Sequence, residues 1–160
     1  MVQVVLGTDR CTQTRDDEAR FEEGIVRALN APSDPTDPYD TPGHRHERAI
    51  RDAILQGSAW AFDGGRDDPQ QVVHALRIAL RHLPTDGMNA PGRNHDPAWL
   101  AALDHTWTQH PWERAIDAIL RTLREAGASI EDHAVERSWE GSTPLVPAIR
   151  RILDEERARR

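Results

Sequence analysis

Five prolines in this chain stand where helices are expected to begin. Each follows Thr, Asp or His and precedes a stretch whose apolar residues recur at helical spacing: Thr41-Pro42, Asp68-Pro69, Asp96-Pro97, His110-Pro111 and Thr143-Pro144. Proline suits the first helical position, because its missing N–H would have no partner inside the helix and its φ is already near the helical value. A Thr or Asp just before it can cap the remaining free N–H groups. The pattern therefore predicts a mainly helical protein.

Apolar stripes behind these starts predict six or seven helices in one compact, bundle-like domain over residues 1–160. One stripe follows Thr14 and another follows Asp68: Phe21, Ile25, Val26 and Leu29, then Val73, Leu76, Leu80 and Leu83. Gly57 is expected to weaken or bend the helix that contains it. Gly127 is placed to end the helix that begins at Pro111.

Four stretches fall outside this helical pattern. Residues 33–40, rich in Pro and Asp, predict an exposed loop, and residues 85–95, rich in Gly, Asn and Pro, predict a second loop. Residues Val2 to Leu6 are mostly β-branched and predict one short strand. Residues 129–139 fit either a helix or an extended segment paired with that strand.

Composition excludes several classes of function. The single cysteine, Cys11, rules out an intrachain disulfide. All 20 basic residues are arginine, so mechanisms that need a lysine, such as a P-loop or a Schiff base, are excluded. The net charge of −7 makes nucleic acid an improbable partner, since its backbone requires a basic face. No apolar run approaches the ~20 residues of a membrane span, and Met1 to Leu6 is too short for a signal peptide, so we expect a cytoplasmic protein.

The distribution of charge favours a protein-interaction module. Residues 1–40 contain nine acids and four arginines. An acidic adaptor, inhibitor or immunity-type protein without catalytic activity or cofactor would fit this pattern and would bind a protein with a basic surface. Five residues are the candidate contacts, four in the 33–40 loop and one before a turn: Asp34, Asp37, Tyr39, Asp40 and Trp139.

Two alternatives remain open. His44 and Glu47 are three residues apart, which places them on one face of a helix, and His105 and His110 flank the turn between two later helices. Together these four groups could hold Zn²⁺ or another divalent ion in a helical hydrolase. The second alternative is a helix-turn-helix regulator over residues 96–127, although the charges of its second helix balance to neutrality, which suits phosphate contacts poorly.

Overall fold

The computed structural model describes residues 15–38, 40–62, 68–92, 96–106, 112–130 and 145–159. These residues form seven helices: α2 (Arg15–Leu29), α3 (Pro42–Phe62), α4 (Gln70–Leu80), α5 (Thr85–Met88), α6 (Ala98–Thr106), α7 (Trp112–Glu125) and α9 (Leu145–Arg159). The predicted mainly helical fold is confirmed. The predicted strand at Val2 to Leu6 and residues 131–139 of the ambiguous stretch lie outside the described residues.

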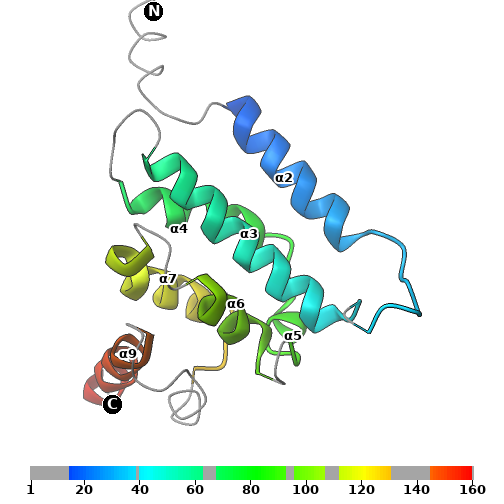
Figure 1. Cartoon of the computed structure of the whole chain (residues 1–160). Helices are drawn as coiled ribbons and strands as arrows, with labels where there is room; N and C mark the ends of the chain where they lie inside the picture. Colours follow the sequence, from blue (N-terminus) through cyan, green and yellow to red (C-terminus); the bar gives the residue numbers. More distant parts are fainter. Residues whose placement is uncertain are drawn as a thin grey trace, which may run out of the picture.

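The long helix α3 organises the arrangement. Helices α4 and α6 pack against α3, α7 packs against α4, and α9 packs against α7. Helix α2 runs along α3 and α4, so that α2 and α9 lie at opposite edges of the molecule (Figure 1).

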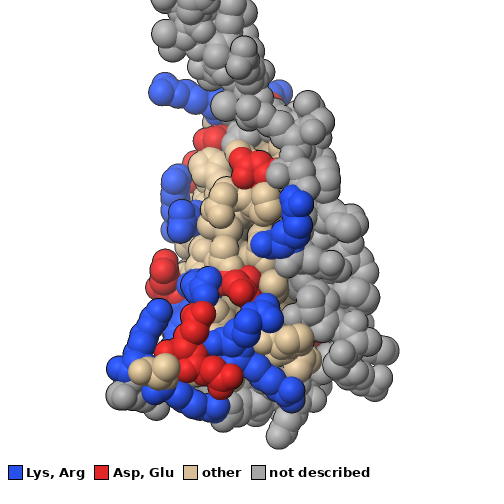
Figure 2. Space-filling model, turned by 90° about the vertical axis from the view of Figure 1, so that its left-hand side faces the viewer, with Lys and Arg blue, Asp and Glu red and all other residues tan. Residues whose placement is uncertain are grey.

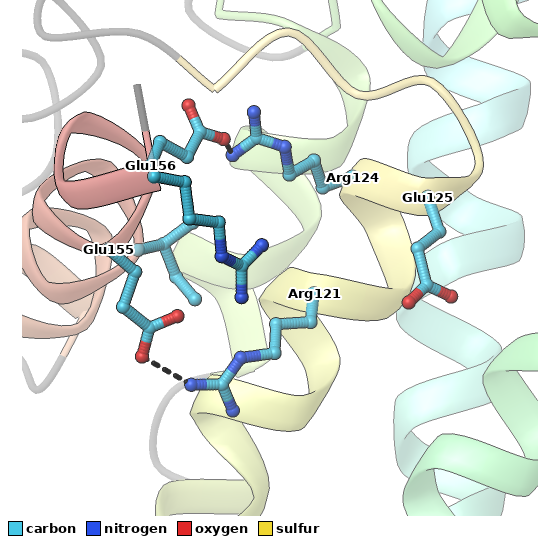
Figure 3. Close-up of a pocket in the computed structure, with 7 residues that line it drawn as sticks. Arg121, Arg124, Glu125, Glu155 and Glu156 are labelled. Atoms are coloured by element: carbon cyan, nitrogen blue, oxygen red, sulfur yellow. Dashed lines mark hydrogen bonds and ion pairs between the residues drawn. The ribbon is translucent and has the colours of Figure 1, made fainter.

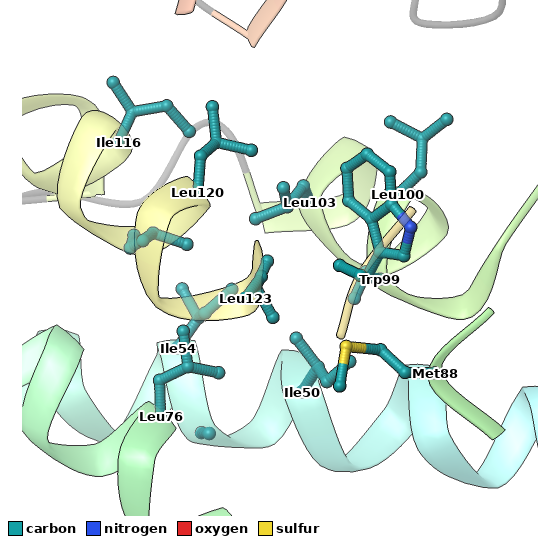
Figure 4. Close-up of a cluster of buried hydrophobic side chains, with 14 of the residues drawn as sticks. Ile50, Ile54, Leu76, Met88, Trp99, Leu100, Leu103, Ile116, Leu120 and Leu123 are labelled. Carbon is teal, nitrogen blue, oxygen red and sulfur yellow. The ribbon is translucent and has the colours of Figure 1, made fainter. Parts of the chain in front are cut away.

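The core lies where α3, α4, α6 and α7 meet. Its largest members are almost completely inaccessible to water, and Trp99 is among them. Figure 4 shows their side chains converging from four helices: Ile50 and Ile54, Leu76, Trp99 and Leu103, Leu120 and Leu123. Full burial of one such side chain contributes about 1.5–3 kcal/mol. This core fixes the positions of α6 and α7.

One predicted helix start is built as expected, and a second is displaced by one residue. The Thr41 hydroxyl accepts the backbone N–H of His44 at 3.2 Å, which caps α3 at Pro42. The Asp68 carboxylate accepts the backbone N–H of Gln70 at 3.1 Å. Helix α4 begins at Gln70, one residue after Pro69.

The predicted end of α7 is also confirmed. Gly127 has a φ of 111°, in the left-handed region where a side chain would be strained. Its N–H donates to the Arg124 carbonyl at 2.9 Å, and the Ala128 N–H donates to the Leu123 carbonyl at 3.0 Å. This pair of bonds is the Schellman arrangement of a helix C-terminus.

Three other local predictions differ in detail from the structure. Helix α4 ends at Leu80, and the stripe residue Leu83 is buried from the turn that follows. The 85–95 stretch contains one helical turn, α5. Gly57 lies within a continuous α3, and a Cβ there would lie 2.5 Å from the Val72 Cα of α4. Its function is to let the two helices approach closely.

Candidate functional site

The predicted interaction loop is exposed from residue 33 to residue 38, but its acids have partners inside the protein. Asp34 accepts hydrogen bonds from the Thr36 N–H at 2.9 Å and the Thr36 hydroxyl at 2.6 Å, which lower its pKa. The Asp37 N–H donates to the Asp34 carbonyl at 3.1 Å. The other two predicted contacts, Tyr39 and Trp139, lie outside the described residues. The loop is therefore a structured turn.

Arg45 of α3 holds both ends of this loop. Its Nε donates to the Asp40 carboxylate at 2.5 Å, and this bond, with a second one from the Asp34 N–H, lowers the pKa of Asp40. The same guanidinium donates to three backbone carbonyls at the end of α2, those of Leu29, Ala31 and Pro32. Asp40 therefore has a structural role, since only 11% of its side chain is exposed.

The proposed metal ligands at the start of α3 also have structural surroundings. The His44 Nδ1 lies 2.6 Å from the Thr41 hydroxyl, and Glu47 is buried against the turn at Gly92. The side chain of His105 and the whole of His110 lie outside the described residues. Where the structure describes the chain, no group of three or more His, Cys, Asp or Glu side chains is placed to hold a metal ion.

His46 is a buried residue that its sequence position did not reveal. Its Nδ1 lies 2.6 Å from the Pro42 carbonyl, which can only accept, so Nδ1 carries the proton. The opposite ring edge packs on α5, because a Cβ at Gly87 would lie 2.2 Å from the His46 Nε2. His46 therefore joins α5 to α3.

Asp104 of α6 is the one described acid whose pKa is raised to about 7. Burial is the main cause, and the nearby carboxylate of Asp96 adds repulsion. Within the described residues, the buried Asp104 Oδ1 has no hydrogen-bond partner. The sequence carries a faint signal of this, since Asp104 directly follows the apolar segment Ala-Trp-Leu-Ala-Ala-Leu. Its raised pKa makes Asp104 a group whose ionisation opposes folding.

Oppositely charged residues join α7 to α9 in regular steps. Asp117 pairs with Arg151 at 2.7 Å, and Arg121 pairs with Glu155 at 2.6 Å. Both pairs are separated by 34 residues, so α7 and α9 run in the same direction. Arg124 and Glu156 form a further ion pair. We call this set of paired charges the α7–α9 ladder.

The ladder opens at its C-terminal end into a groove. The next step would join Glu125 to Arg159, whose charges are opposite, but these two form no ion pair within the described part of the chain. Figure 3 shows Glu125 turned away from α9. The groove has a volume of about 440 Å³, and its lining combines three arginines, three glutamates and one isoleucine: Arg121, Arg124, Arg159, Glu125, Glu155, Glu156 and Ile152.

The molecular face around α7 and α9 has a mixed electrostatic character. Basic and acidic side chains are interspersed at one end of it, and an uncharged band lies beside them (Figure 2). Sequence analysis missed this groove because the ladder joins residues 34 positions apart, whose alignment depends on packing.

No known family, curated protein or solved structure matches this chain. None of the described helices is both long and apolar enough to cross a membrane.

Proposed function

We propose that this chain is a non-catalytic protein-interaction module, of the adaptor, inhibitor or immunity type, and that the α7–α9 groove is its contact surface. The observation that carries the proposal is the open step of the ladder. Glu125 and Arg159 line a concave site with opposite charges that are not used on each other. A protein partner that presents a basic and an acidic group can satisfy both.

The ion pairs in the closed steps of the ladder are weak, which favours their replacement by ion pairs with a partner. Arg121 and Glu155 are 47% and 40% exposed at the side chain. An exposed ion pair contributes only about 0.2–1 kcal/mol. A partner can therefore rearrange the charges that line the groove at small cost to the fold.

Net charge supplies the long-range component of recognition. At −7 the protein attracts a partner with a basic surface, and such steering raises the association rate at low salt. The alternating charges of the groove then select one register of the partner and oppose others, because like charges brought together are unfavourable.

The test uses two variants with the same change of charge. Glu125→Arg alters the groove, whereas Glu23→Arg alters an exposed position on α2. A partner is captured from the native host, purified, and titrated against each form by calorimetry, with association rates measured at about 50 and 300 mM salt. We expect Glu125→Arg to weaken binding about tenfold or more, the equivalent of 1.4 kcal/mol.

The control variant separates the groove from the net charge. Glu23→Arg should slow association slightly and leave the dissociation rate unchanged. Equal weakening by the two variants would show that net charge alone drives binding, and salt-independent association with an acidic partner would contradict the proposal entirely.

A further inference from the structure

Helix α2 is attached to the rest of the protein by a narrow strip. Only Ile25 of α2 is buried, and Phe21 and Leu29 are partly buried beside it. The helix lies at the edge of the molecule, against α3 and α4 (Figure 1). Part of the surface beneath it is a small apolar cluster of its own, formed by Trp60, Ala75 and Ile78.

The contacts across this strip are directional. The ring of Phe21 meets Trp60 edge to face, with centroids 5.6 Å apart. Two hydrogen bonds between a carboxylate and an imidazole flank this ring contact, each at 2.7 Å: Glu18 with His74, and Glu22 with His82. Because both acids come from α2 and both histidines from the segment at α4, the surface accepts α2 in one register.

The connection from α2 to α3 divides into two parts. Arg45 holds the carbonyls of Leu29, Ala31 and Pro32, so this end of α2 belongs to the docked unit. Residues 33–38 are exposed, and the hydrogen bonds of Asp34 are made inside the loop, to Thr36 and Asp40. The segment 33–38 can therefore change its path while the contacts of α2 and Arg45 stay intact.

We propose that the α3–α4 surface beneath α2 also binds α2 of a second copy, so that the chain forms dimers by exchanging this helix. Every contact of α2, including those with Arg45, re-forms between the copies, and only the loop is altered. Exchange of an identical element is a low-cost route to a dimer because the contact energies cancel. Pro35 and Pro38 lie in two turns, closed by hydrogen bonds from the Asp37 N–H to the Asp34 carbonyl and from the Asp40 N–H to the Asp37 carbonyl, and these turns are what the exchange must open.

In the native protein, the concentration of the chain sets the balance between the monomer and the exchanged dimer. A tethered helix returns to its own chain with an effective concentration on the order of mM. We therefore expect the monomer to dominate at micromolar concentration, with dimers accumulating towards the millimolar range. The proposal goes beyond the groove function, which does not require dimers.

A pair of charge-reversed variants tests the exchange directly. The first carries Glu18→Arg and Glu22→Arg on the docking helix, and the second carries His74→Glu and His82→Glu on the surface. In the first variant alone, arginines on α2 face the native histidines and have no acidic partner. In the second variant alone, glutamates on the surface face the native glutamates of α2. Each variant therefore binds its own α2 more weakly. When the two are mixed, the first variant's α2 meets glutamates on the second, and the second variant's native α2 meets native histidines on the first.

Sedimentation analysis at about 200 µM provides the readout, in a range below the millimolar return concentration. We expect the 1:1 mixture to form mainly heterodimers, while each variant alone, and the first variant mixed with the native protein, remains mostly monomeric. A mixture that sediments like its separate components would overturn the proposal. If a variant fails to fold by circular dichroism, ¹⁴N and ¹⁵N native proteins are incubated together near 1 mM and examined by native mass spectrometry, where absence of mixed-mass dimers has the same consequence.

Discussion

Replacing Asp104 by asparagine should stabilise the protein increasingly as the pH rises. Asp104 has a pKa of about 7 in the folded state, against an ordinary value of 3.8. A pKa that folding raises means that the folded protein resists ionisation. The stability associated with the protonated group is fully present below about pH 4 and is lost as the pH rises towards 7. Asparagine is nearly isosteric and never ionises, so it avoids this loss.

The magnitude follows from the two pKa values. At 1.36 kcal/mol for each tenfold change in proton affinity, ionising Asp104 in the folded state costs about 4 kcal/mol. The residue is only partly buried, and solvent screening lowers this cost, so we expect about 2 kcal/mol. For a chain of 160 residues this corresponds to a difference in melting temperature of about 4–8 °C at pH 8.

Urea unfolding from pH 4 to pH 8 measures the effect, with Asp154→Asn as the control. Asp154 lies on α9 with 73% of its side chain exposed. The free energy of unfolding of Asp104→Asn, relative to the native protein, should grow with pH and level off above about pH 7, while that of the control stays flat. A difference for Asp104→Asn that is constant over this range, or a variant less stable than the native protein at pH 8, would refute the reasoning.

Two further predictions concern packing and the loop. Gly57→Ala should lower the free energy of unfolding by about 3 kcal/mol, because its Cβ would meet the backbone of Val72, which cannot rotate away. Gly24→Ala, at a helical position with open space around it, should instead raise stability by about 0.5–1 kcal/mol; thermal melts compare the two, and losses of equal size would show that no close approach exists at Gly57. Arg45→Met should raise the pKa of Asp40 towards its ordinary value of 3.8, because the main hydrogen bond that lowers it is lost, and ¹³C NMR titration of the carboxyl group follows the change. In the native protein the contribution of Asp40 to stability is present above that value and is lost as the pH falls through the lowered pKa; an unchanged Asp40 titration in Arg45→Met would contradict the role of Arg45.

Local chemistry explains which parts of the fold could be predicted from sequence. The start of α3 depends on Thr41 and Pro42, and the end of α7 depends on Gly127, so each signal lies within a few residues of the structure it produces. The apolar stripes correctly placed Ile25 and Leu76 in the core. These features require no knowledge of which helices are neighbours.

The candidate site depends on contacts between residues that are far apart in the sequence. The acids of the 33–40 loop suggested an interaction surface, but Asp40 is held by Arg45, a partner that charge counting does not reveal. The role of Gly57 depends on where α4 crosses α3. The groove arises because the α7–α9 ladder closes at Arg121 and Glu155 and opens at the next step, which is a consequence of helix packing.

Hydrogen–deuterium exchange on the protein with and without its purified partner tests the proposed contact surface most directly. If the groove is the contact surface, binding should slow amide exchange in the C-terminal halves of α7 and α9, around residues 121–125 and 152–159, and leave α2 and the loop at residues 33–38 unchanged. Slower exchange confined to α2 and this loop, with the α7–α9 groove unaffected, would contradict the account.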